Sequence, residues 1–282
     1  MIVFVTGATG YIGAAVVSEL IAAGHEVVGL SRSDRGDAAL KDAGARAQRG
    51  TLEDLDALRS AAAATDGVIH LAFNHSGDFS NFAASLEVDL RVIKTVGEAL
   101  AGSGKPLVTT SHMNGAASDD AVLAFAGRGV RSAVVSLAPS VHGDGDKAFV
   151  PALINIAREK GFSAFVGEGT NRWPAVHRLD AAHLYRLALE KAPSGSRLFG
   201  RGEEGVPFRD IAGAIGRQLN VPVLSIPASQ AEAHFGFLGR IASLDIPTLF
   251  SGSSVHTREL LGWLPVNPGL IADLELGHYF NS

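Results

Sequence analysis

The chain has 282 residues, of which 46% are hydrophobic and 19% are charged, as in ordinary globular proteins and unlike disordered or fibrous ones. The formal net charge of −5 gives no general attraction to nucleic acid or to an anionic membrane, so we expect neither as a partner. Cysteine is absent, which excludes disulfides, thiolate metal sites and cysteine nucleophiles.

The N-terminal apolar run at residues 2–6 ends in a glycine loop and is too short for the core of a signal peptide. No window approaches the roughly 18 uninterrupted apolar residues of a membrane span. We therefore expect a cytoplasmic protein.

Short apolar runs alternate with alanine- and leucine-rich helical patterns through the first half of the chain. Strands are expected at 2–6, 26–31, 46–49, 67–73, 106–111 and 132–139, and helices at 11–23, 36–43, 53–63 and 82–101, with a short helix after residue 111. This alternation, with strands apolar throughout, is typical of a parallel sheet covered on both faces. It predicts an α/β fold with a doubly wound parallel Rossmann sheet.

The pattern becomes irregular after about residue 142. Helices are expected at 149–160, 180–190, 207–219, 229–238 and 267–275. We predict a dinucleotide-binding Rossmann domain over residues 1–142. Residues 143–282 are predicted to form mostly a small C-terminal substrate-binding lobe, with segments that return to the sheet, near the strand ends where open α/β folds bind ligands.

A glycine-rich segment, VTGATGYIG, joins the first strand to the first helix and contains Gly7, Gly10 and Gly13. Glycines here permit a tight turn and close approach of the backbone to a pyrophosphate, while the helix N-terminus supplies N–H donors. An ordinary tight loop is the alternative reading. The strand before and the helix after favour a dinucleotide site, to which Thr9, Tyr11 and Ile12 would also belong.

The second strand ends at Ser31 and Arg32, where sites selecting NAD usually carry a carboxylate for the ribose hydroxyls. Ser31 can donate to a 2′-phosphate and Arg32 can pair with one. A solvated surface arginine is the alternative. The pattern favours NADP(H) over NAD(H).

Several motifs, in order along nearly the whole chain, resemble the extended and atypical short-chain dehydrogenases/reductases, which include nucleotide-sugar epimerases. They are TGATGYIG, RGTLEDLDALRSA followed by DGVIHLAF, LVTTS, SLAPSVHGDGD, VHRLDAAHLYRLAL and TRELLGWLPVNPGLIADL. The resemblance implies cofactor contacts near the adenine for Leu52, along the ribose and pyrophosphate for Leu71, Ala72 and Phe73, and beside the nicotinamide for Pro139, Ser140 and Val141.

That family places a Ser or Thr after the fifth strand and a Tyr-x-x-x-Lys pair on the next helix, with Tyr as general acid/base. Ser111 occupies the place of the serine, but no tyrosine or lysine occurs between Ser111 and Pro139. The usual mechanism cannot be written for this chain. A homodimer is a further possibility from the resemblance, although residues 112–131 are short for the helix that often forms its interface.

Two histidines are candidates to replace the missing proton donor. His142 stands where the family commonly has a tyrosine near the substrate, and an imidazole can protonate a carbonyl oxygen at neutral pH. A hydrogen-bonded structural role is its alternative. His112 follows Ser111 and is expected to point to the opposite face if the strand continues, so we place it in the substrate pocket and keep Ser111 and His142 as catalytic candidates.

A later segment resembles the stretch that the family runs from its substrate lobe back to the sheet. Arg172, Trp173 and His177 are predicted to line a pocket, and Asp180 to cap a helix over 181–190. The ten histidines form no recognisable metal-ligand set, so no metal is expected.

The sequence thus predicts an NADP(H)-dependent oxidoreductase that acts on a small carbonyl or alcohol with non-standard acid/base groups. A catalytically idle NADP(H)-binding redox sensor or scaffold is the alternative, because the catalytic pair is missing. A nucleotide-sugar epimerase is a weaker alternative, since it normally keeps that pair and uses NAD.

Overall fold

The computed structural model describes residues 1–74, 81–249 and 252–280. The chain folds into two compact units. The first contains Met1–Leu137, Ala181–Phe199 and His256–Trp263, and the second contains Ala138–Asp180, Gly200–Val255 and Leu264–Ser282. Two late segments therefore return to the first unit.

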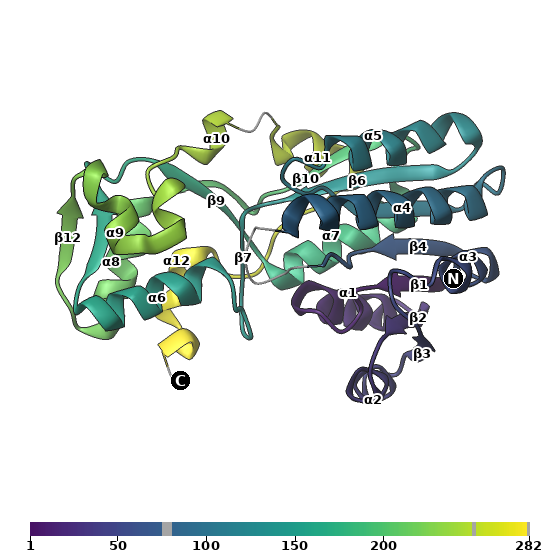
Figure 1. Ribbon diagram of the computed structural model, residues 1–282, viewed down its shortest axis with the longest axis horizontal. Helices are drawn as coiled ribbons and strands as arrows, with labels where there is room; N and C mark the ends of the chain where they lie inside the picture. Colours follow the sequence, from purple (N-terminus) through teal and green to yellow (C-terminus); the bar gives the residue numbers. More distant parts are fainter. Residues whose placement is uncertain (75–80, 250–251, 281–282) are drawn as a thin grey trace. The chain divides into compact units, whose positions relative to one another are not determined.

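A seven-stranded sheet lies at the centre of the first unit, in the order β10-β6-β5-β4-β1-β2-β3 (Figure 1). Strands β1 to β6 pair in parallel, and the order runs outward from β1 in both directions. The strands are β1 (Ile2–Thr6), β2 (Glu26–Ser31), β3 (Arg46–Arg49), β4 (Gly67–His70), β5 (Pro106–Thr110), β6 (Arg131–Leu137) and β10 (Ser196–Gly200). This is the doubly wound Rossmann arrangement, and the predicted fold class is confirmed.

Helices connect these strands and cover both faces of the sheet. They are α1 (Tyr11–Ala22), α2 (Asp34–Asp42), α3 (Leu55–Ala64), α4 (Phe82–Leu100), α5 (Ala116–Ala124), η2 (Phe125–Arg128), α7 (Arg178–Lys191) and α11 (Ser254–Leu261). Val92 and Val96 of α4 share a core with Phe4, Val68 and Leu107 of the strands. Because alternate residues of a strand point to opposite faces, the neighbours of these strand residues face the other side.

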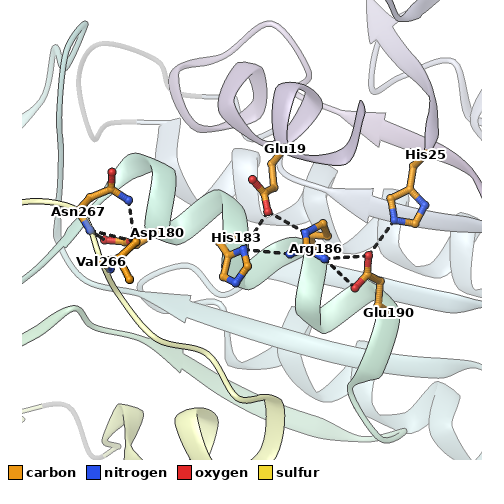
Figure 2. Close-up of polar contacts among 8 residues, drawn as sticks. All are labelled: Glu19, His25, Asp180, His183, Arg186, Glu190, Val266 and Asn267. Atoms are coloured by element: carbon orange, nitrogen blue, oxygen red, sulfur yellow. Dashed lines mark hydrogen bonds and ion pairs between the residues drawn. The ribbon is translucent and has the colours of Figure 1, made fainter. Parts of the chain in front are cut away.

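On that other side, α7 packs against the sheet and is tied to α1. Tyr185 is fully buried and its hydroxyl lies 2.7 Å from Oγ1 of Thr110. Figure 2 shows the tie to α1, in which Glu19 accepts from Arg186 Nε at 2.7 Å and lies 2.8 Å from His183 Nδ1. Ion pairs thus reinforce the packing of α7.

The second unit contains a three-stranded sheet, in the order β11-β9-β7, and a two-stranded sheet of β12 and β8. Its elements are β7 (Ser140–His142), α6 (Phe149–Lys160), β8 (Ser163–Val166), β9 (Arg172–His177), β11 (Glu203–Pro207), α8 (Phe208–Leu219), β12 (Val223–Ile226), η3 (Ala228–Gln230), α9 (Ala231–Phe235), η4 (Gly236–Arg240), α10 (Ile246–Leu249), α12 (Leu270–Glu275) and η5 (His278–Phe280). Its core gathers around Trp173, Phe208 and Leu270, each at most 1% exposed. The sequence did not predict these short strands.

Two expectations for this region are wrong. The helix expected at 229–238 is broken into η3, α9 and η4, because Gly236 has a φ of +59° and interrupts the helix. Asp180 is not a cap, since α7 begins at Arg178. Instead its carboxylate accepts from the backbone N–H groups of Val266 and Asn267 (Figure 2).

Within the described part of the chain, every helix is too short or too polar to span a membrane.

Candidate cofactor and active site

The glycine loop follows β1 directly, and its backbone leaves no room for side chains. Gly7 has a φ of +68°, and a Cβ there would lie 2.8 Å from the backbone N of Ala72. A Cβ on Gly13 would lie 1.9 Å from the carbonyl oxygen of Gly7. Both positions require glycine. Residues with a side chain disfavour the positive φ of Gly7, and a side chain at Gly13 would collide with the backbone of Gly7.

Helix α1 begins directly at this loop. Its N-cap is Gly10, and no acidic residue lies in the first turn. Thr9 is exposed and Tyr11 and Ile12 are half-buried, so the predicted loop residues reach the surface. A helix N-terminus approached by glycines suits an anion such as a pyrophosphate.

The segment after β4 lies against the glycine loop. The backbone N–H of Ala72 donates to Oγ1 of Thr6 at 3.2 Å, and that of Leu71 donates to the Thr6 carbonyl at 3.3 Å. The structure therefore brings Leu71 and Ala72, predicted to line the cofactor, beside Gly7. Leu52, predicted near the adenine, is 7% exposed and packs in the core with Leu30.

The end of β2 carries no free carboxylate among the residues nearest to it. Arg32 is exposed, and Ser33 caps α2 by accepting from Gly36 N at 3.2 Å. Asp34 and Asp37, the acidic residues in the first turn of α2, both pair with Arg49, at 3.0 and 2.8 Å. Ser31 is buried, and its hydroxyl donates to the Ser33 carbonyl at 3.1 Å.

At the end of β5, Ser111 Oγ donates to Asp119 Oδ2 of α5 at 2.7 Å. The same carboxylate oxygen lies 3.5 Å from Nη1 of Arg197 on β10. Burial raises the pKa of Asp119 above its ordinary value. The Ser111 hydrogen bond and the Arg197 charge oppose that rise, while the carboxylates of Asp120 and Asp89 add to it.

His112 turns to a different set of neighbours. Its ring centroid lies 4.0 Å from that of Phe73, and its Nε2 lies 3.9 Å from Oδ1 of Asp89. Asp89 is 1% exposed and also lies 3.1 Å from His70 Nε2, whose ring in turn meets Thr6 Oγ1 at 2.6 Å. Burial acts to raise the pKa of Asp89, but His70 and the charge of His112 outweigh it, so the pKa is lowered.

Asp89 and Asp119 were not identified as site residues from the sequence. Asp89 lies three and seven residues before the buried Val92 and Val96, and therefore on the same face of the helix. A charged residue on the apolar face of the predicted helix was the signal that could have identified it. Asp119 had no such signal, because its partner Ser111 lies eight residues away across a turn whose course the sequence does not reveal.

The remaining predicted residues belong to the second unit. His142 on β7 is 1% exposed, and its Nδ1 lies 2.8 Å from Asp273 Oδ2, while its buried Nε2 has no partner among the described residues. Of the three residues expected beside the nicotinamide, Ser140 is buried, Val141 is half-buried and Pro139 is exposed. The geometry of His142 matches the structural alternative.

The predicted pocket residues have partners within the same unit. Arg172 pairs through Nη2 with Asp245 Oδ2 at 2.8 Å, and its Nε donates to Oδ1 at 3.0 Å. Trp173 lies in the core, at 1% exposure. His177 Nδ1 accepts from Leu179 N at 3.3 Å, and burial together with the charge of His142 lowers its pKa, so His177 is neutral at pH 7. The described residues hold no group of three or more His, Asp or Glu side chains arranged for a metal ion.

Taken with the sheet topology, the glycine loop defines a Rossmann-type fold. Residues 3–111 match the model of the NAD dependent epimerase/dehydratase family. The chain is 46% identical over 301 positions to "Uncharacterized protein C2A9.02" of Schizosaccharomyces pombe, covering 99% of this chain and all of that protein. The chain belongs to the same family as that protein, and its residues 3–111 carry the epimerase/dehydratase match.

More distant relatives and structures agree on the fold. A "4-hydroxy-2-methyl-3-oxo-4-farnesyl-3,4-dihydroquinoline-1-oxide ketoreductase" of Stigmatella aurantiaca is 29% identical over 266 positions, covering 83% of this chain and 79% of the relative. A putative epimerase of Burkholderia cenocepacia has a TM-score of 0.76 at 22% identity, over 98% and 96% of the two chains. The dTDP-glucose 4,6-dehydratase DesIV of Streptomyces venezuelae, with NAD bound, has a TM-score of 0.74 at 19% identity, over 98% and 96%.

Proposed function

We propose that this protein is an NADP(H)-dependent oxidoreductase that reduces a small ketone or oxidises the corresponding alcohol. The named ketoreductase and a 2-alkyl-3-oxoalkanoate reductase of Stenotrophomonas maltophilia, 26% identical over 257 positions, favour an oxo compound as substrate. In this proposal the protein's partner is a small molecule.

The residues at the end of β2 are the observation that favours NADP(H) over NAD(H) in this proposal. Arg32 is exposed there, and Arg49 pairs with Asp34 and Asp37, so a 2′-phosphate would meet a cation. Neither Ser31 nor Arg32 supplies the carboxylate that usually accepts from the ribose hydroxyls in a site for NAD. The NAD-bound DesIV shares only the fold at its level of identity and does not bear on this choice.

In this proposal the N–H groups at the start of α1 would hold the pyrophosphate of a bound dinucleotide, and Arg32 would hold its 2′-phosphate. When bound, the nicotinamide supplies the reducing equivalent to a carbonyl carbon. Ser111 then orients the carbonyl oxygen, since it stands at the carboxyl edge of the sheet.

An idle NADP(H)-binding sensor is the second candidate, and one observation favours it. The interval 112–138 lacks the Tyr-x-x-x-Lys pair, and the Ser111 hydroxyl already has a protein acceptor. A nucleotide-sugar epimerase is a weaker candidate, because it normally has the Tyr-x-x-x-Lys pair and an acidic NAD determinant, and this chain lacks that pair and has Ser31 and Arg32 at the end of β2.

Calorimetric titration with NADPH and NADH tests the cofactor, and a panel of 3-oxo esters and other ketones tests the activity. We expect NADPH to bind more tightly, and Arg32→Ala to weaken NADPH by about 10-fold or more, since a charge-assisted hydrogen bond contributes about 1.5–3 kcal/mol. Arg46→Ala is the matched control, because Arg46 is exposed at the opposite end of the β2–β3 pair. Tight NADPH binding without turnover of any ketone would support the sensor, and no binding of either dinucleotide would refute both candidates.

A further inference from the structure

The structure pairs the Ser111 hydroxyl with a buried carboxyl group on the next helix. Ser111 Oγ and Asp119 Oδ2 are 2.7 Å apart, and Asp119 is 8% exposed. We propose that Asp119, acting through Ser111, supplies the proton that a tyrosine supplies in other members of the family. This inference rests on the proposed reductase function and identifies a positioning residue for it.

The surroundings of Asp119 fit a carboxyl that holds and releases a proton. The described groups that act on its charge include Ser111 from the end of β5, Arg197 from β10, Asp120 from its own helix and Asp89 from α4. Burial and the two neighbouring carboxylates favour the neutral acid, so its pKa lies above the ordinary value. Arg197, 3.5 Å away, stabilises the carboxylate that remains after the proton leaves.

Asp119, Ser111 and water account for every proton in the transfer. In the neutral form, Asp119 donates to Ser111 Oγ, which frees the Ser111 O–H to donate to the substrate oxygen. As the carbonyl carbon is reduced by NADPH, the Ser111 O–H bond breaks toward the substrate oxygen and the Asp119 O–H bond breaks toward Ser111 Oγ. Asp119 is left as a carboxylate and regains a proton from water, while NADP⁺ and the alcohol leave.

The two histidines have other neighbours. His112 stacks on Phe73, and its Nε2 lies 3.9 Å from Asp89 Oδ1. His142 is 1% exposed, with its Nδ1 2.8 Å from Asp273 Oδ2. The Ser111 hydroxyl, by contrast, donates directly to Asp119.

A measurement on the cofactor-free protein tests the first half of the proposal. Carboxyl carbon NMR, with Asp119 assigned by comparison with Asp119→Asn, follows the titration of this group. We expect a midpoint above the ordinary value of about 3.9, and a further rise in Ser111→Ala, because that variant removes a hydrogen bond to the charged form. A midpoint at or below the ordinary value, or one unmoved by Ser111→Ala, would overturn the proposal.

Kinetics with NADPH and a ketone test the second half. Asp119→Asn keeps the shape and a hydrogen bond but cannot release a proton, so we expect kcat to fall about 100-fold or more with NADPH affinity unchanged. In the wild type, kcat should decline as pH rises through the pKa of Asp119, and Asp119→Asn should lose that dependence. Asp56→Asn, which removes an exposed carboxylate that pairs with Arg59, should stay within twofold of wild type.

The outcomes separate the two claims. If the wild type reduces a ketone and Asp119→Asn is equally active, the role of Asp119 in proton transfer is overturned, while the proposed reductase function stands. A large loss in His112→Asn with Asp119→Asn unaffected gives the role to His112 and also overturns it. A wild type that binds NADPH and reduces no ketone removes the proposed function and this inference together.

Discussion

Replacing Gly13 with alanine provides the strictest test of the glycine loop. The added methyl carbon would lie 1.9 Å from the Gly7 carbonyl oxygen, 1.5 Å inside the 3.4 Å at which ordinary contact begins. Overpacking costs about 1–3 kcal/mol, and the obstacle here is backbone, so we expect the upper end. An alanine inside a helix recovers about 1 kcal/mol relative to glycine, which leaves a net loss of about 2 kcal/mol.

For a chain of this size, that loss corresponds to a decrease in Tm of about 4–8 °C. The loop must also shift away from the pyrophosphate, so NADPH affinity should fall by about 10-fold or more, as for one lost charge-assisted hydrogen bond. Thermal unfolding and calorimetric titration measure the two effects. Gly127→Ala is the control, because a Cβ there meets nothing within 4 Å. A Gly13→Ala protein with wild-type Tm and NADPH affinity would refute the reasoning.

Three further predictions follow from buried or paired groups. Tyr185→Phe should cost about 1 kcal/mol in urea unfolding by removing the bond to Thr110, while kcat stays unchanged; a lower kcat would give the phenol a chemical role. His142→Ala should cost about 3 kcal/mol by leaving the Asp273 carboxylate buried without its partner, and a folded variant with wild-type stability but slow turnover would contradict this. Burial acts to raise the pKa of Glu19, but Arg186 and His183 outweigh burial and the pKa is lowered. Glu19 therefore adds stability above its ordinary pKa, and this stability is lost as the pH falls through the lowered pKa. Glu19→Gln should reduce the pH dependence of the unfolding free energy on the acid side by less than about 1 kcal/mol, and an unchanged slope would refute this.

The Rossmann sheet was predictable because its determinants are local. Residues 2–6 are apolar throughout, the glycine loop follows at once, and α1 begins at Tyr11 as expected. The strands of the second unit have only three to six residues, so no periodicity distinguishes them from loops. The predicted cap at Asp180 was wrong because its true partners, at 266 and 267, lie far along the chain.

In the candidate site, too, the sequence predicted the features that depend on neighbouring residues and missed the contacts between distant ones. The sequence placed Ser111 at a strand end and Arg32 after β2, since both positions depend on neighbouring residues. It could not pair Ser111 with Asp119, because that contact depends on how α5 is oriented after the turn. Nor could it pair His142 with Asp273, 131 residues away, although that contact determines whether the imidazole is open to a substrate.

The tight packing around Ser31 matters for anyone who wishes to convert the cofactor preference by engineering. Ser31 is 4% exposed, and a Cβ added at Gly36 would lie only 2.3 Å from its hydroxyl oxygen, so the space beside it is narrow. A carboxylate introduced at position 31 would be buried without a counter-ion, at a cost of several kcal/mol. Position 32 is exposed and accepts an acidic side chain freely. A switch toward NAD should therefore be designed at Arg32, with Ser31 kept as the residue that fixes the turn.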